Sequence, residues 1–245
     1  MSPVRQQISY TARHSAESAP LSGDSRLTVT ESVTVRSLST ERGADFAEWR
    51  AVYDICCRTG DNGQPIASDR WRIFPRLWVE PYEKIFPQWT YVAQSGGIVI
   101  GYLTGCPDSR AFAKARLWHY ALPLLMDVVR GRYPGSRDAR RFVRQFFGLE
   151  QGPERAFPRE LRRMLRRDYP AHLHMNVDAA WRRSGVGTKL VDTFFSDLRN
   201  AGISGVHLYC GGDPLVFYLH RGFKELARVG FHGLPVYVLG CGWQN

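Results

Sequence analysis

Residues 171–222, AHLHMNVDAAWRRSGVGTKLVDTFFSDLRNAGISGVHLYCGGDPLVFYLHRG, contain the pattern that decides the fold. The first seven residues alternate apolar and polar side chains, which is typical of a strand with one buried face. A glycine loop at 181–188 follows, and the helix predicted after it ends near Gly202. Residues 206–210 form a second predicted strand before a short helix. The apolar face of the long helix is predicted to comprise Leu190, Val191, Phe194, Phe195 and Leu198.

The glycine loop has the features of an anion site. A helix that starts after a strand and a glycine turn points the free N–H groups of its first turn into that turn. Gly185 and Gly187 carry no side chain, so a phosphate can approach the backbone, and Arg182 and Arg183 add positive charge. We therefore predict a diphosphate site, with a plain tight turn as the alternative, because the R-x-x-G-x-G spacing is short.

Two motifs in this order resemble the GNAT family, the Gcn5-related N-acetyltransferases. In that family an R/Q-x-x-G-x-G/A loop, matched by 182–187, binds the pyrophosphate of acetyl-coenzyme A. A later F-Y-x-x-x-G-F pattern is matched by 217–223. The resemblance covers about 27–241 and implies an α/β (α+β) GNAT fold. That fold has a mixed central sheet with splayed parallel strands, flanked by helices, and here it would carry a helical insert.

The resemblance also implies roles for individual residues. Tyr218 matches the tyrosine that often protonates the leaving thiolate of coenzyme A; a packed helix tyrosine is the alternative. The backbone of Met175, Asn176 and Val177 would pair with pantetheine and polarise the thioester carbonyl. The pyrophosphate would be bound by the loop residues Arg182, Arg183, Ser184, Gly185, Val186, Gly187 and Thr188.

No general base is evident in the sequence. His174 alternates with apolar residues, so we expect it to face the acceptor cleft, as a catalytic residue or as a hydrogen-bonded structural histidine. Three carboxylates lie in segments that resemble the acceptor side, and each is more simply a surface or capping group: Asp54, Asp61 and Glu80. Three cysteines are most simply buried small residues: Cys56, Cys57 and Cys210.

The rest of the chain is predicted to complete one domain. Residues 1–25 lack periodicity and are predicted to be a disordered tail, and 26–245 to be the acetyltransferase domain. Asp213 is expected to cap the short helix, with Pro214 at its first position. Further elements are expected as a strand at 27–36, a helix at 45–58, a helical stretch at 71–86 interrupted at Pro75 and Pro81, and hairpins of 89–93 with 98–105 and of 226–231 with 234–239.

A helical insert is expected at about 107–169 and ends in the arginine-rich stretch RELRRMLRR, 159–167. These arginines form either a solvated helix face or a basic rim that attracts an anionic acceptor or the 3′-phosphate of coenzyme A. Together with 53–61 and 169–174, the insert narrows the resemblance to a GNAT subgroup. That subgroup is related to the acetyltransferase-like C-terminal domain of O-GlcNAcases.

Composition narrows the function classes. Five cysteines without paired spacing predict reduced thiols in a cytoplasm and no metal site. No apolar run approaches membrane-spanning length, and no nucleic-acid module is evident. The net charge of +10 favours anionic ligands, although an arginine-rich proteome would explain it as well.

Two functions are carried forward from the sequence. The first is an acyl-CoA-dependent N-acyltransferase, with acetyl-CoA as the expected donor and a primary amine of a small molecule or peptide as acceptor. It would act by direct transfer through a tetrahedral intermediate, as a monomer or homodimer. The second is a non-catalytic module that binds coenzyme A, a peptide or another ligand, because Gly211 and Pro214 replace the family's usual asparagine and alanine.

Overall fold

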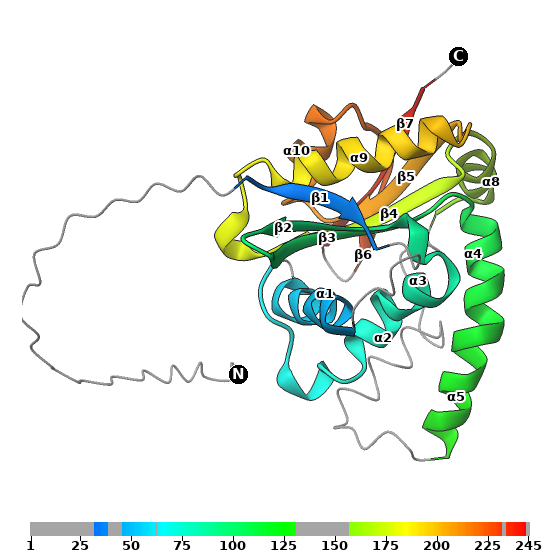
Figure 1. Cartoon of the computed structure of the whole chain (residues 1–245). Helices are drawn as coiled ribbons and strands as arrows, with labels where there is room; N and C mark the ends of the chain where they lie inside the picture. Colours follow the sequence, from blue (N-terminus) through cyan, green and yellow to red (C-terminus); the bar gives the residue numbers. More distant parts are fainter. Residues whose placement is uncertain (1–31, 39–45, 62, 131–156, 232–233, 244–245) are drawn as a thin grey trace, which may run out of the picture. The chain divides into compact units, whose positions relative to one another are not determined.

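The computed structural model describes residues 32–38, 46–61, 63–130, 157–231 and 234–243 (Figure 1). The predicted tail at 1–25 and the middle of the insert at 131–156 lie outside the described residues. All described residues belong to one compact unit, Glu31–Asn245.

A mixed sheet of seven strands forms the centre of this unit, in the order β1-β2-β3-β4-β5-β7-β6. Strands β4 and β5 pair in parallel, and the other neighbouring strands pair antiparallel. The mixed sheet confirms the predicted fold class. The strands are β1 (Thr34–Ser37), β2 (Thr90–Ser95), β3 (Ile98–Cys106), β4 (Ala171–Val177), β5 (Gly205–Cys210), β6 (Lys224–Phe231) and β7 (Leu234–Gly242).

Helices cover both faces of the sheet. Figure 1 shows α9 and α10 on one face and α1, α2 and α3 on the other, with α4 and α5 beside them. No helix in the described ranges is long and apolar enough to cross a membrane. The helices are α1 (Phe46–Thr59), α2 (Phe74–Trp78), α3 (Glu80–Ile85), α4 (Ser109–Arg116), α5 (Leu122–Val129), α8 (Arg159–Asp168), α9 (Val186–Asn200) and α10 (Leu215–His220), and a π-helical turn, Leu117–Ala121, joins α4 to α5.

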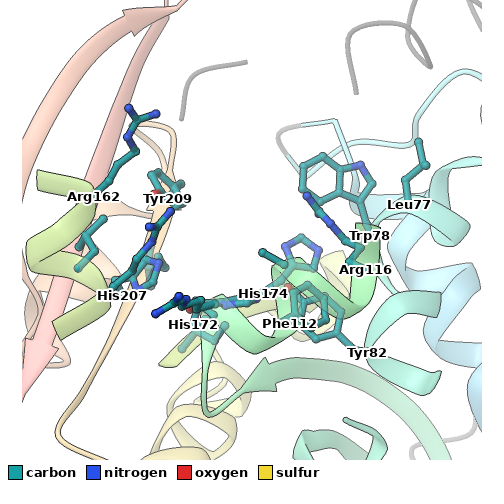
Figure 2. Close-up of a pocket in the computed structure, with 17 residues that line it drawn as sticks. Leu77, Trp78, Tyr82, Phe112, Arg116, Arg162, His172, His174, His207 and Tyr209 are labelled. Carbon is teal, nitrogen blue, oxygen red and sulfur yellow. Dashed lines mark hydrogen bonds between the residues drawn. The ribbon is translucent and has the colours of Figure 1, made fainter. Parts of the chain in front are cut away.

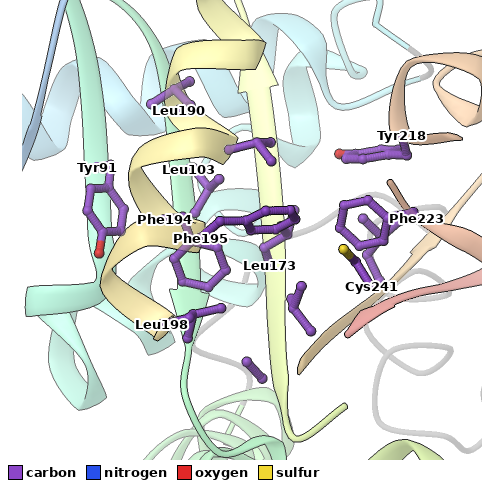
Figure 3. Close-up of a cluster of buried hydrophobic side chains, with 14 of the residues drawn as sticks. Tyr91, Leu103, Leu173, Leu190, Phe194, Phe195, Leu198, Tyr218, Phe223 and Cys241 are labelled. Atoms are coloured by element: carbon purple, nitrogen blue, oxygen red, sulfur yellow. The ribbon is translucent and has the colours of Figure 1, made fainter. Parts of the chain in front are cut away.

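The main core lies between α9 and the sheet (Figure 3). Leu190, Phe194 and Leu198 of α9 are fully buried against Leu103 of β3 and neighbouring strand residues, which confirms the predicted apolar face. Each such side chain contributes about 1.5–3 kcal/mol by leaving water. Gly105 of β3 allows the close approach, because a Cβ there would lie 2.5 Å from the Phe194 ring. This packing fixes α9, and therefore the loop before it, on the sheet.

Three local predictions differ from the structure. Pro75 and Pro81 lie in the first turns of α2 and α3, so they begin helices rather than interrupt one, since proline lacks only an N–H that is unpaired there anyway. Asp213 does not cap α10, whose N-cap is Pro214 without a side-chain bond. The first strand begins at Thr34 within the described residues, later than predicted.

Candidate active site

The parallel strands β4 and β5 separate after a short paired segment. They pair at two positions only, Ala171 with Val206 and His172 with His207. On its other edge β4 stays paired with β3 from His172 to Val177. The edge of β4 beyond His172 therefore faces a gap between the splayed strands.

The direction of the β4 backbone groups follows from two contacts to β3. The Asp178 amide donates to the Ile100 carbonyl at 2.9 Å, and the Thr104 hydroxyl donates to the His174 carbonyl at 3.3 Å. Even-numbered residues thus direct their backbone groups toward β3. Because successive residues of a strand alternate, Met175 and Val177 direct their N–H and C=O groups into the gap.

The glycine loop lies at the C-terminal end of β4 and starts α9. Gly185 is the N-cap with φ 84° and ψ −2°, a left-handed conformation that glycine adopts without strain, and α9 has no side-chain cap. Its first-turn N–H groups are therefore available to an anion. At Gly187 a Cβ would lie 3.3 Å from Met175 Cε and 3.3 Å from Phe217 Cζ, so β4, α9 and α10 converge here.

The polar side chains of the loop have different roles in the structure. Arg182 donates to the carbonyls of Gly63, at 2.7 Å, and Val177, at 3.3 Å, so it ties the loop to Gly63 and to the end of β4. Arg183 is exposed and has φ 63°, and the Ser184 hydroxyl donates to the Trp181 carbonyl at 2.6 Å. Of these two arginines, only Arg182 forms side-chain hydrogen bonds with the described residues.

Tyr218 of α10 is buried on the α9 side of the sheet, with its ring against Phe217 and Phe223. Figure 3 shows its hydroxyl directed toward β4 and α9. Burial, with a smaller contribution from Cys210, raises the pKa of Tyr218, so the phenol keeps its proton at pH 7. Tyr218, which matches the general-acid tyrosine of the family, thus lies beside the gap between β4 and β5.

A cavity of about 690 Å³ lies on the opposite face of the sheet (Figure 2). Its walls come from α2, α3, α4, α8, β4 and β5. Leu173 and Leu208 also line it, although both side chains belong to the core on the α9 side. The cavity therefore reaches the gap between β4 and β5, where a group bound on the β4 edge would be accessible from it.

His174 lies in the wall of this cavity, on the face predicted from the alternation. Its ring stacks on Trp78 with centroids 5.8 Å apart, and its Nε2 is 3.3 Å from the Tyr102 hydroxyl. That hydroxyl accepts a hydrogen bond from the Asn176 amide at 3.0 Å. Burial lowers the pKa of His174 to about 4, so the ring is neutral at pH 7.

His172, which the sequence did not single out, forms a second network at the cavity floor. The Ser109 hydroxyl donates to the Pro170 carbonyl at 2.7 Å, so it accepts from His172 Nδ1 at 2.8 Å. His172 Nε2 then accepts from the Tyr82 hydroxyl at 2.8 Å. Burial, together with His207, Arg116 and His174, lowers the pKa of His172 well below its usual range. The period-2 pattern placed His172 beside His174, but its partners lie far away in sequence.

The remaining sequence candidates lie outside the cavity. Asp54 pairs with Arg58 at 2.9 Å, Glu80 pairs with Lys84 at 2.8 Å, and Asp61 is exposed. All five cysteines are free thiols. Cys106 contacts His172 Nδ1 at 2.9 Å, but burial raises the pKa of its thiol to about 12, which disfavours a thiolate nucleophile. Within the described ranges, no three His, Cys, Asp or Glu side chains gather as metal ligands.

Comparisons with known proteins place the fold. No protein-family model matches the chain. The crystal structure of SsHAT is 30% identical over 86% of this chain and 98% of that chain, with a TM-score of 0.64. PH1933 from Pyrococcus horikoshii OT3 is 13% identical over 87% of this chain and 100% of that chain, with a TM-score of 0.53, and shares the fold alone. A GCN5-related N-acetyltransferase from Kribbella flavida is 16% identical over 86% and 98%, with a TM-score of 0.48.

Proposed function

The chain belongs to the GNAT superfamily of N-acetyltransferases, and from that premise we propose that it transfers an acetyl group from acetyl-CoA to a primary amine of a small molecule or peptide. The observation that carries the proposal is the gap between β4 and β5, which has a free backbone edge on one side and the α9 N-terminus at one end. The narrower likeness to the O-GlcNAcase-related subgroup stays a prediction.

The pyrophosphate of the donor is expected at the α9 N-terminus. Free N–H groups and the helix dipole favour a phosphate there, and Gly185 leaves space for it, since a Cβ at that position would meet nothing within 4 Å. Arg183 is an exposed residue of the loop and supplies a further positive charge. Arg182 would act indirectly, because its bonds to the Gly63 and Val177 carbonyls hold the loop in shape.

The pantetheine arm is expected to lie on the free edge of β4. Amide groups of pantetheine can pair with the backbone of Met175 and Val177, as a further strand would. The backbone of Asn176 would not pair with pantetheine directly, since its own N–H and C=O groups point toward β3. Asn176 would instead hold Met175 and Val177 in place on either side of it. Running from the loop toward the N-terminal half of β4, the arm would bring the thioester to the inner end of the gap.

The groups that carry out acyl transfer would then lie on the two faces of the sheet. A neutral amine in the cavity attacks the thioester carbonyl, and a backbone N–H of β4 stabilises the oxyanion of the tetrahedral intermediate. The C–S bond breaks, and Tyr218 protonates the leaving thiolate from the α9 side. His174 is neutral and lies on the acceptor side, where it is a candidate to take the proton released by the amine.

Binding and turnover test the proposal separately. Calorimetry should show that acetyl-CoA binds at least about tenfold more tightly than S-acetylpantetheine, which lacks the pyrophosphate. Thiol release should then depend on an added primary amine. Absence of acetyl-CoA binding would contradict the proposal. Tight binding without turnover of any amine would favour the non-catalytic alternative.

A further inference from the structure

The acceptor cavity has a positively charged wall. Arg110 and Arg116 of α4 and Arg162 and Arg166 of α8 all line it. Among the residues that the structure describes, no aspartate or glutamate lines the cavity. Figure 2 shows Arg162 and Arg116 on opposite sides, with His172 between them at the floor. Four arginines therefore surround a space that no described aspartate or glutamate lines.

Within the described residues, the two α8 arginines that line the cavity, Arg162 and Arg166, form no ion pair with a carboxylate. Arg167, on the outer side of α8, pairs with Asp168 at 2.7 Å, whereas no described carboxylate forms an ion pair with Arg162 or Arg166. His172 and His174 in the cavity wall are neutral at pH 7 and add no charge. The positive charge of Arg116 is one of the causes that lower the pKa of His172. The floor of the cavity therefore experiences a positive potential.

The cofactor does not account for this potential. The pyrophosphate loop follows Val177, at the C-terminal end of β4, whereas the cavity is lined by the N-terminal half, His172–His174. Three or more residues of strand separate them, which is about 10 Å or more. In coenzyme A the adenosine 3′-phosphate is attached on the other side of the pyrophosphate from pantetheine, so with the pantetheine arm along β4 it would be directed away from the cavity. The arginines are thus placed to bind the acceptor.

We propose that the acceptor is a small amine that also carries an acidic group, a carboxylate or a phosphate, bound by Arg162 and Arg166 with Arg110 and Arg116 opposite. This inference rests on the proposed function. A guanidinium binds a carboxylate or a phosphate with two parallel hydrogen bonds. The negative charge of this group also offsets the repulsion between the arginine-lined wall and the positive charge of the amine. The volume of about 690 Å³ is in the range of small-ligand sites. Trp78 and Phe112 supply apolar surface for the rest of the molecule.

The test is a thiol-release assay with matched pairs of amines. Tyrosine against tyramine isolates a carboxylate, and phosphoethanolamine against ethanolamine isolates a phosphate, as does glucosamine 6-phosphate against glucosamine. In at least one pair, kcat/KM for the acidic member should exceed that for the neutral member by about tenfold or more. Which pair responds identifies the anion.

Two variants of α8 localise the effect. Arg162→Gln combined with Arg166→Gln should reduce the acidic-to-neutral preference by about 10- to 100-fold. Arg167→Gln, the matched control, removes one positive charge from the same helix but lies outside the cavity, and it should keep the wild-type preference. Acetyl-CoA affinity should be the same in all three proteins.

The outcomes separate this inference from the proposed function. If acetyl-CoA binds and neutral amines react as well as their acidic partners, the inference is overturned and the function stands. Reduced acetyl-CoA affinity in the double variant would also overturn it, by assigning the arginines to the cofactor. If no amine turns over, phosphoethanolamine and tyrosine are titrated into the acetyl-CoA complex. Binding that needs Arg162 and Arg166 supports the inference, and no binding overturns it.

Discussion

Replacing Gly185 by glutamate, with glutamine as the matched control, measures the charge at the proposed pyrophosphate site. Gly185 has φ 84°, so either side chain adds backbone strain of about 1–2 kcal/mol, and a Cβ there meets nothing within 4 Å. Strain and bulk are therefore common to both variants. They differ only in one negative charge at the N-cap of α9.

The expected difference follows from Coulomb's law. A carboxylate about 7 Å from a pyrophosphate with two negative charges, at an effective dielectric constant of about 40–80, costs roughly 1–2 kcal/mol. This corresponds to about 5- to 30-fold weaker binding of coenzyme A to Gly185→Glu than to Gly185→Gln. Without ligand the order reverses, because a carboxylate at a helix N-terminus stabilises the helix by about 0.3–1 kcal/mol. The glutamate variant should thus be the more stable apoprotein and the weaker binder.

Calorimetry with coenzyme A at 0.1 M and 1 M salt measures this difference, and thermal melting measures apoprotein stability. The affinity gap should shrink at high salt, because the Debye length falls from about 10 Å to about 3 Å. Equal affinities of the two variants at low salt would refute the placement of the pyrophosphate at this loop.

Three further predictions concern the strand and its neighbours. Tyr218→Phe should lower kcat by about 10²–10⁴-fold while coenzyme A affinity and melting temperature stay near wild type, and unchanged kcat with rate-limiting chemistry would exclude the general-acid role. The pKa of His174 is lowered to about 4 in the folded protein, so as the pH falls below about 6.5 this histidine takes up a proton in the unfolded chain before it does so in the folded protein. The free energy of unfolding should therefore fall between pH 7 and pH 4, by up to about 3 kcal/mol from this residue. Urea titrations across that range should show a smaller pH dependence of the unfolding free energy for His174→Gln than for the wild type. An equal pH dependence in the two proteins would contradict the assignment. Coenzyme A should slow amide exchange at Met175 and Val177 more than at Asn176, whose amide already points toward β3, and equal slowing at all three would contradict the edge pairing.

Much of the fold is local in sequence and could be predicted. The alternation in 171–177 and the helical spacing after Gly187 depend on neighbours within a few residues, and both elements form where the pattern places them. The positive φ values of Gly202 and Gly222 fit the predicted helix ends for the same reason. A proline occurs both in the first turn of a helix and where a helix breaks, so the sequence around Pro75 does not distinguish the two roles.

The site depends on contacts between distant segments, which the sequence does not encode in a readable pattern. Tyr82 and Ser109 lie 90 and 63 residues from His172, so no spacing rule could bring them together. The arginines of α8 show the same limit. Their sequence is compatible with a solvated face and with a basic rim, and only the packing of α8 beside β5 places Arg162 and Arg166 at the cavity.

A crystal structure of the protein with coenzyme A tests the central claim most directly. We predict the pyrophosphate on the backbone amides of 185–188, the pantetheine arm paired with Met175 and Val177, and the sulfur at the inner end of the gap beside Tyr218. Coenzyme A bound elsewhere, or a gap between β4 and β5 that stays empty at saturating ligand, would contradict the account.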